Sequence, residues 1–456
     1  MKLRRIETPS ISHYAYVIAD GDDAVVVDPR RDVGEYLEVA RALGARVRYI
    51  IETHRQEDFE LGSTHLAELT GAEVVNGRHD CFGRGDHRLA DGDEIGFGGV
   101  TLRALHTPGH TPESMSYAVL IDGEAWAVLT GDALFYGETG RTDLPARDRQ
   151  GENAALLYDM VHDKIAPLGD GVIVLPAHGP GSVCGSGMSS LPFSTIGTER
   201  KSNVVFTMSR GDFVAHKGSE RLPRPPYFRH MEEVNLRGGR PLRRPPSAVP
   251  MLGPDALAAA LRDATLIDTR SPESFAGGHI ADAYSVWQGG LPVFSGWVAH
   301  DASAVALVGD DHSSLDESVS HLARIGIDAV AGGLSGGFSS WRDSGRPVRR
   351  CSTITPRELV ERRREFTVLD VREADEVAAG HIPGALHAYV GHLEDTLPEL
   401  DLPRGKPIVV TCGVGHRAGL AASMLLRAGF VQVYNLLGGM KAWGTLGLPT
   451  NEGDPS

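Results

Sequence analysis

The chain has 456 residues, more than one ordinary hydrophobic core organises, so we expect about two to four domains. Its 41% hydrophobic and 23% charged residues are typical of a globular protein, and 60 acidic against 45 basic residues give a formal net charge of −15. This charge argues against nucleic-acid or anionic-membrane partners. No apolar run approaches the roughly 20 residues of a membrane span, and the N-terminus lacks the apolar core of a signal peptide, so we expect a cytoplasmic protein.

The first 200 or so residues alternate short β-branched runs with Gly, Asp and Pro turn signals, and segments of helical periodicity separate some of these runs. This pattern predicts an α/β region in which polar side chains follow the strand ends. The predicted strands cover residues 14–20, 24–29, 47–54, 100–106, 115–131 and 171–178, and the predicted helices cover 33–44 and 63–71.

Potential metal ligands follow several of these strands. They are His54 and Asp58, His106 and His110, Asp132, and His178. A single histidine is more often a core or surface residue than a ligand. Several of them beside Gly or Pro, each after an apolar run, indicate loops that gather ligands at one edge of a sheet.

Residues 1 to 220 resemble the metallo-β-lactamase fold, a four-layer α/β/β/α sandwich, and within it most closely the persulfide dioxygenases. Supporting sequences are "GRTD" (140–143) and "HGPGSVCG" (178–185). The resemblance implies one Fe(II) per chain held by His54, His110 and Asp132. It also implies that a thiol persulfide and O₂ react at open iron positions and give sulfite.

The loop after residue 53 departs from the pattern of that superfamily. The expected H-x-H-x-D-H reads here with Gln56 and Phe59 in place of the second and third histidines. A two-metal hydrolase needs both of those imidazoles, so glyoxalase-II-like or lactamase-like hydrolysis is disfavoured. A two-His, one-carboxylate triad needs neither, and that ligand set suits non-haem Fe(II) and oxygen chemistry.

Three further residues of this region are candidates for substrate contact. Arg141 either orients a substrate anion or forms a structural ion pair with Asp143. Cys184 either relays sulfur near the metal or is a simple buried thiol, and His178 is expected in the outer shell of the metal, where it polarises a group or shuttles protons. Cys81 and Cys351 have no such context, and the wide spacing of the four cysteines argues against structural disulfides.

A Pro- and Arg-rich segment at 218–250 is predicted to connect the first region to a repeated unit. Asp268 and Asp370, like Trp341 and Trp443, are separated by 102 positions, so two copies of one domain follow. Each copy reads as strand and helix in alternation, which predicts a small, mainly parallel sheet covered by helices. We expect domains at 1–250, 251–350 and 351–456.

The second copy contains a strand that ends at Cys412, followed by a loop with Gly413 and Gly415 and then by an amphipathic helix. A thiol in this position has its thiolate stabilised by backbone N–H groups and by the helix dipole, and His416 and Arg417 add positive charge. The glycines let the loop amides point inward as an anion-binding nest. Cys412 is therefore predicted to be reactive.

This copy resembles the rhodanese sulfurtransferases in the Cys412 loop, in "GHIPGA" (380–385) and in the closing Gly-Gly-x-x-x-Trp. The resemblance implies that Cys412 carries a sulfane sulfur as a persulfide, while Arg417 and the loop amides, including those of Gly413, Gly415 and His416, hold the anion. Asp370 and Arg372 are expected to form a structural ion pair.

In the first copy Asp310 stands at the position of Cys412 and Leu315 at that of Arg417, so this copy resembles an inactive rhodanese domain and is interpreted as a spacer or docking unit. The domain order is similar to bacterial persulfide dioxygenase–rhodanese fusions. We therefore expect sulfide and persulfide metabolism, with a low-molecular-weight thiol persulfide, O₂, sulfite and thiosulfate as reactants. The alternatives are a sulfurtransferase whose first domain is metal-poor, or a scaffold for sulfur-carrier proteins. Homo-oligomer formation is left open.

Overall fold

The computed structural model describes residues 1–80, 82, 85–144, 147–185 and 187–453. Cys81 therefore lies outside the described residues. The chain divides into two compact units, Met1–Arg243 with Ala323–Gly326 and Arg244–Leu322 with Ile327–Ser456. Within the described ranges, no helix has the length and apolar character that crossing a membrane requires.

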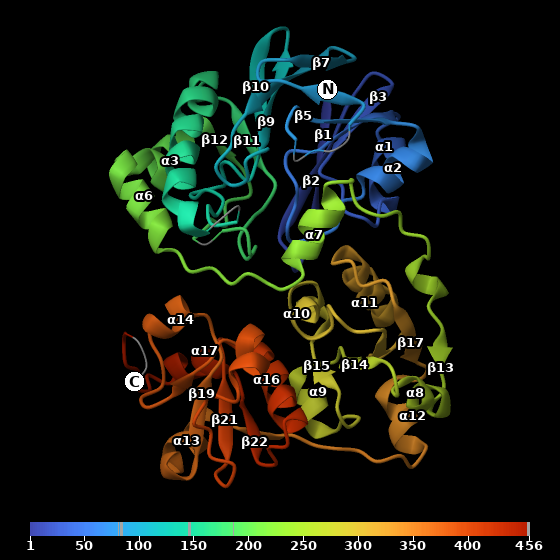
Figure 1. Ribbon diagram of the computed structural model, residues 1–456, viewed down its shortest axis with the longest axis vertical. Coiled ribbons are helices and arrows are strands. Elements are labelled where there is room, and N and C mark those ends of the chain that lie inside the picture. The colour runs from blue at the N-terminus through green and yellow to red at the C-terminus, as the bar shows by residue number, and fades with distance from the viewer. Residues whose placement is uncertain (81, 83–84, 145–146, 186, 454–456) are drawn as a thin grey trace. The chain divides into compact units, whose positions relative to one another are not determined.

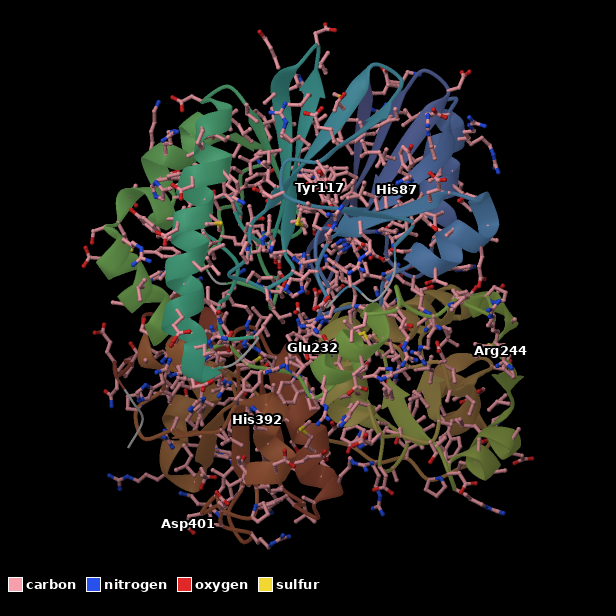
Figure 2. All side chains as sticks on the ribbon, turned by 45° about the horizontal axis from the view of Figure 1, so that its top comes forward. His87, Tyr117, Glu232, Arg244, His392 and Asp401 are labelled. Carbon is pink, nitrogen blue, oxygen red and sulfur yellow. The ribbon has the colours of Figure 1, made fainter. Side chains whose placement is uncertain are left out.

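The first unit is built on two six-stranded sheets (Figure 1). The first sheet has the order β1 (Lys2–Thr8), β2 (His13–Asp20), β3 (Asp23–Val27), β4 (Arg46–Ile51), β5 (Glu73–Gly77) and β6 (His87–Leu89). The second has the order β12 (Ser194–Thr195), β11 (Ile173–Pro176), β10 (Glu124–Gly131), β9 (Met115–Ile121), β8 (Val100–His106) and β7 (Glu94–Phe97). Their inner faces share one apolar core, in which Tyr117 lies between the sheets (Figure 2).

Helices cover the outer face of each sheet and complete the predicted α/β/β/α sandwich (Figure 1). The first sheet is covered by α1 (Gly34–Ala42) and α2 (Ser63–Thr70), and the second by α3 (Gln150–Met160) and α6 (Arg210–Ser219). The remaining helices of this unit are α4 (Ile196–Ser202), α5 (Val204–Thr207) and α7 (Phe228–Asn235). The segment predicted as a plain connection thus contains α7, which buries Phe228, Met231 and Asn235.

The second unit contains the two predicted repeats, and their five-stranded parallel sheets have the same strand order. In the first copy the order is β13 (Met251–Leu252), β17 (Val330–Leu334), β16 (Val305–Val308), β14 (Thr265–Asp268) and β15 (Tyr284–Ser285). In the second it is β18 (Ser352–Ile354), β22 (Val433–Leu436), β21 (Ile408–Thr411), β19 (Thr367–Asp370) and β20 (Leu386–His387). The prediction of a small parallel sheet in each copy is confirmed.

The helices repeat in the same way. The first copy has α8 (Pro254–Ala260), α9 (Pro272–Gly277), α10 (Leu291–Val298), α11 (His312–Arg324) and α12 (Gly337–Asp343). The second has α13 (Pro356–Glu361), α14 (Ala374–Ala378), α15 (Leu393–Thr396), α16 (His416–Arg427) and α17 (Gly439–Thr445).

Helix α16 of the second copy is buried on all sides, because residues 418–425 are all shielded from solvent. The first copy packs against it directly. A Cβ on Gly419 would lie 2.7 Å from the Cβ of Pro272, and the Ser285 N–H donates to Ser423 Oγ at 3.0 Å. One apolar cluster consequently contains residues of both copies, including Cys412.

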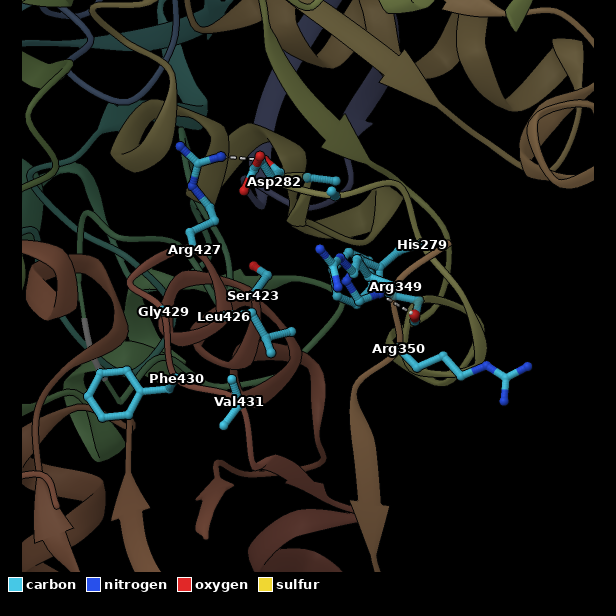
Figure 3. A pocket seen from close by; sticks show the side chains of 13 residues that line it. His279, Asp282, Arg349, Arg350, Ser423, Leu426, Arg427, Gly429, Phe430 and Val431 are labelled. Atoms are coloured by element: carbon cyan, nitrogen blue, oxygen red, sulfur yellow. Dashed lines mark hydrogen bonds between the residues drawn. The ribbon is translucent and has the colours of Figure 1, made fainter. Parts of the chain in front are cut away.

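A pocket of about 440 Å³ opens between the copies at the C-terminal end of α16 (Figure 3). His279 and Asp282 come from the first copy, Ser423 and Arg427 from α16, and the Arg427 guanidinium donates to the backbone oxygen of Asp282. A helix of this length spans about 18 Å. The pocket is therefore separate from the Cys412 loop, which lies at the other end of α16.

Candidate metal centre and sulfur-carrier loop

Three strand ends bring His54, His110 and Asp132 together in the first unit. His54 follows β4, His110 lies in the loop after β8, and Asp132 follows β10. The three side chains are buried, and one ligand atom from each lies within 4.8 Å of the others. Gly131 permits this approach, because its φ is +52° and a Cβ there would lie 2.9 Å from Thr53 Oγ1.

The facing atoms of this cluster lack hydrogen bonds. His54 Nε2 and His110 Nε2 lie 3.8 Å and 3.3 Å from Asp132 Oδ2, and none of the three atoms has a hydrogen-bond partner among the described residues. Buried polar atoms without partners are costly. A cation at this point would satisfy all three, and two imidazoles with one carboxylate suit Fe(II) with open positions. The residues therefore fit a single metal ion.

Hydrogen bonds on the far side of each imidazole set its tautomer. The Thr53 hydroxyl donates to Asp28 Oδ2 at 2.7 Å, so its oxygen accepts from His54 Nδ1–H at 2.9 Å. His110 Nδ1–H donates to the Arg141 backbone oxygen at 2.9 Å. Both Nε2 atoms are thereby left with a free lone pair that faces Asp132, as metal ligation requires.

The charges of His54 and Asp132 match this arrangement, whereas the effect of burial on His110 is outweighed by Asp132 and Glu57, which raise its pKa. Burial lowers the pKa of His54 to about 3, so its imidazole is neutral at physiological pH. Burial raises the pKa of Asp132, but the imidazoles of His178, His54 and His110 outweigh it and hold that pKa well below its usual range. A neutral imidazole and an ionised carboxylate are the ligand forms that a metal ion binds.

The loop that lost two histidines is held in place without them. Phe59 packs in an apolar cluster with Leu61, 4.2 Å from the His13 ring. Asn235 of α7 donates to the backbone oxygens of Gln56 and Phe59 at 2.7 Å and 2.8 Å, and its Oδ1 accepts from Leu61 N–H. Apolar packing and one buried amide therefore position this loop.

We expect Asp28→Asn to weaken iron binding by about 10- to 100-fold. The new side-chain amide can donate to Thr53 Oγ1, and the Thr53 hydroxyl then donates to His54 Nδ1 instead of accepting from it, so this Asp28–Thr53–His54 relay no longer sets the tautomer that leaves Nε2 free for a metal. Metal titration of the apoprotein measures the change. Asp22→Asn, at an exposed position before β3, is the control and should bind iron like the unchanged protein. Equal affinity in both variants would contradict a role for the relay.

Arg141 uses every donor of its guanidinium inside the protein. Its Nε and Nη2 donate to Asp143 at 2.7 Å and 2.8 Å, and the remaining N–H groups reach the backbone oxygens of residues 183, 222 and 223. Of the two roles predicted for Arg141, the geometry favours the structural ion pair, because no N–H remains for a substrate anion. The predicted contact of Arg141 with a substrate anion stays a prediction.

His178 and Cys184 lie beside the cluster. His178 bridges two carboxylates, with Nδ1 2.8 Å from Asp132 Oδ1 and Nε2 3.1 Å from Asp58 Oδ2. The Cys184 thiol, Asp58 and His178 also form a group within 4.8 Å. Burial, with the carboxylates of Asp58 and Asp132, raises the pKa of Cys184 well above its ordinary value, so this thiol is protonated at neutral pH.

The Cys412 loop has the predicted strand–loop–helix geometry. Cys412 follows β21 and is almost fully buried, and the Gly415 N–H donates to its Sγ at 3.1 Å just before α16 begins. Helix α17 approaches from behind, where Met440 N–H donates to the Cys412 oxygen at 2.8 Å and Lys441 N–H to the Gly413 oxygen at 2.9 Å. Backbone amides thus shape the loop, and one of them, that of Gly415, stabilises its sulfur.

The closing Gly-Gly motif allows this approach of α17. Gly439 has a φ of +52°, and a Cβ there would lie 2.2 Å from the Cys412 oxygen. Only glycine fits at such a distance.

Two ion pairs support the loop. Asp370 and Arg372 form the expected structural pair, with contacts as short as 2.7 Å, and Arg372 also donates to the backbone oxygens of Glu376 and Gly380. Arg417 forms a second pair that the sequence did not predict. Its Nη1 and Nη2 donate to the two carboxylate oxygens of Glu376 at 2.6 Å and 2.7 Å.

The degenerate copy contributes a side chain to this loop. The Trp287 ring of the first copy stacks on the His416 imidazole, with centroids 4.8 Å apart and planes inclined by 16°. The strand registers place Gly309, and not the expected Asp310, at the position of Cys412, because Val308 pairs with Asp268 as Thr411 pairs with Asp370. Asp310 is exposed beside it, and Leu315 is buried in the apolar core. The copy that lacks the cysteine therefore packs against the one that has it.

The comparisons with known proteins match this architecture. The metallo-beta-lactamase superfamily matches residues 10–178, and the rhodanese-like domain matches residues 253–344 and 355–446. The mitochondrial persulfide dioxygenase ETHE1 of Bos taurus is 32% identical over 249 residues, which cover 54% of this chain and 91% of that protein. A hydroxyacylglutathione hydrolase of Anaeromyxobacter dehalogenans (strain 2CP-C) is 36% identical over 167 residues, covering 36% of this chain and 61% of that protein.

A solved structure extends the similarity to the repeated domains. The metallo-beta-lactamase from Staphylococcus aureus subsp. aureus COL has a TM-score of 0.65 and 26% identity, covering 74% of this chain and 99% of that one. The predicted fold class and domain order are confirmed. The chain therefore belongs to the persulfide dioxygenase family of the metallo-β-lactamase superfamily, extended by two rhodanese-like domains.

Proposed function

We propose that the chain oxidises a low-molecular-weight thiol persulfide to sulfite at an iron held by His54, His110 and Asp132, and transfers sulfane sulfur through Cys412. The observation that carries the first activity is the convergence of three buried ligand atoms with no hydrogen-bond partner among the described residues. The relationship to persulfide dioxygenase ETHE1 supports the same reaction. The geometry of the Cys412 loop and the rhodanese-like match support the second activity.

In the first reaction one persulfide R–S–SH, one O₂ and one water give R–SH, sulfite and two protons. Ferrous iron supplies the activation of oxygen for this chemistry. The protein orients the two imidazoles through Thr53 and the Arg141 backbone oxygen, and it encloses the cluster among buried side chains. His178, hydrogen-bonded to Asp132 and Asp58, is placed to hold or release a proton beside the ligands.

In the second reaction sulfite attacks the outer sulfur of a Cys412 persulfide, which gives thiosulfate and the free Cys412 thiolate, or the transfer runs in reverse. The two activities share sulfite and persulfide as reactants. Tethering them in one chain raises the effective concentration of each product near the next site.

Iron content and oxygen uptake test the proposal. Anaerobically purified protein is expected to bind about one iron per chain and to consume one O₂ for each sulfite formed from glutathione persulfide. Less than about 0.2 iron per chain after loading, together with no O₂ uptake, would leave a sulfurtransferase with a metal-poor first domain. A scaffold for sulfur-carrier proteins would lack both oxygen uptake and sulfur transfer.

A further inference from the structure

Glu376 neutralises the positive charge of Arg417, the arginine of the Cys412 loop. Both terminal nitrogens of Arg417 bind its carboxylate, in the bidentate geometry that is strongest for guanidinium and carboxylate. Only the Arg417 side of the pair is largely shielded from solvent, since the Arg417 side chain is 18% exposed and that of Glu376 is 39% exposed. Arg417 is therefore not a free positive charge waiting for an anion.

A comparison of the two copies distinguishes the Glu376–Arg417 pair from the structural Asp–Arg pair. The Asp–Arg clamp after the first long strand is present in both copies, as Asp370 with Arg372 and as Asp268 with Arg270. At the position of Glu376 the degenerate copy has Ser274, and its segment 309–315, which corresponds to the Cys412 loop, contains no arginine. A clamp needed merely for the fold is expected in both copies, so the Glu376–Arg417 pair belongs with the cysteine.

The surroundings of Arg417 are rich in negative charge. Glu373 is the N-cap residue of α14, the helix that carries Glu376. Burial alone would lower the pKa of Arg417, but Glu376, the Cys412 sulfur and Glu373 together raise it. The hydroxyl of Tyr389 is buried near the same groups and stays neutral, because burial raises its pKa. The carboxylate that binds Arg417 and the nearby charge of Glu373 repel a doubly charged anion more strongly than a singly charged one.

We propose that Glu376 determines which sulfur donor Cys412 accepts: by holding Arg417 it weakens the binding of thiosulfate, a dianion, and favours a thiol persulfide, whose –S–SH group is neutral when it is attacked and carries at most one negative charge. This inference rests on the proposed role of Cys412 as the sulfur carrier. Glu376 acts through Arg417 and through its own charge, without touching the transferred atom.

The two competing transfers have the same attacking group. With a persulfide, the Cys412 thiolate attacks the outer sulfur of R–S–SH and the S–S bond breaks. R–S⁻ is the leaving group, and Cys412–S–SH remains on the protein. With thiosulfate, the same thiolate attacks the sulfane sulfur and sulfite leaves, which gives Cys412–S–S⁻. Each transfer moves one sulfur atom and needs no further oxidant or reductant, so the donors differ mainly in charge.

The test compares Glu376→Gln with Asp375→Asn in the full chain. Asp375 lies on the same helix, is exposed, and loses the same charge in the control variant. In Glu376→Gln the KM for thiosulfate should fall about tenfold, while that for hydroxyethyl persulfide falls less than about threefold and kcat stays within about twofold for both. Glu376→Asp, which keeps the carboxylate, should restore a high KM for thiosulfate.

Three KM results would overturn the role proposed for Glu376. An unchanged or higher KM for thiosulfate in Glu376→Gln would overturn the proposal, as would an equal fall for both donors or the same fall in Asp375→Asn. Failure of the underlying function is distinguished by mass spectrometry. If Cys412 of the unchanged protein gains no sulfur atom from either donor, the carrier role fails, whereas a gained sulfur with no charge discrimination refutes only the role of Glu376.

Discussion

Cys412→Ser is expected to lower thiosulfate-to-cyanide sulfur transfer by at least about 1,000-fold, because a hydroxyl in this loop can neither attack sulfane sulfur nor carry it. The Gly415 N–H that contacts Sγ can donate to the serine oxygen instead, so the loop should keep its shape. Oxygen uptake on a thiol persulfide should persist, since this variant leaves the metal cluster unchanged.

Cys351→Ser is the matched control. Its thiol contacts the backbone oxygens of Ser352 and Val433, and burial raises its pKa to about 12, so it is not a nucleophile at neutral pH. Sulfur transfer in this variant should stay close to that of the unchanged protein. If transfer survives in Cys412→Ser but falls in Cys351→Ser, the sulfur carrier is Cys351 and the assignment of Cys412 is wrong.

The second large effect is expected for Asp132→Asn. One carboxylate oxygen of Asp132 faces both candidate imidazole ligands, and the other accepts a hydrogen bond from His178. A neutral amide should weaken iron binding by more than about 100-fold and abolish oxygen uptake. Metal analysis and an oxygen electrode measure the two quantities.

Asp122→Asn provides the comparison for this variant. Asp122 lies in the exposed turn before β10 with a φ of +51°, a conformation that asparagine adopts readily. Thermal unfolding shows whether either protein is destabilised. A folded Asp132→Asn protein that still binds one iron per chain would refute the assignment of Asp132 as a ligand.

Much of the architecture is readable in the sequence because it depends on local patterns. The repeat interval of 102 residues predicts two equivalent domains, and both sheets indeed have the same strand order. The rule that ligands follow strand ends predicts His54, His110 and Asp132 as neighbours, and the structure brings them within 4.8 Å. Their role as iron ligands stays a proposal.

The supporting contacts could not be predicted, because they join segments that are distant in the sequence and carry no motif. Asn235 lies in a segment whose composition indicates only a connection, yet it holds the loop of Gln56 and Phe59. Asp28 looks like an ordinary turn residue after a strand until its hydrogen bonds to Thr53 are seen. Arg141 was ambiguous for the same reason, since its partners are mostly backbone oxygens.

Burial of α16 by both rhodanese copies has a consequence for how this half of the chain unfolds. The helix that begins beside Cys412 has eight consecutive buried residues, and part of their cover comes from Pro272 and Ser285 of the other copy. Opening either copy would expose this apolar helix to water, at a cost of about 25 cal/mol for each Å² uncovered. The two copies should therefore melt together in a single cooperative transition, so that a domain without a reactive cysteine sets the temperature limit of the one that has it.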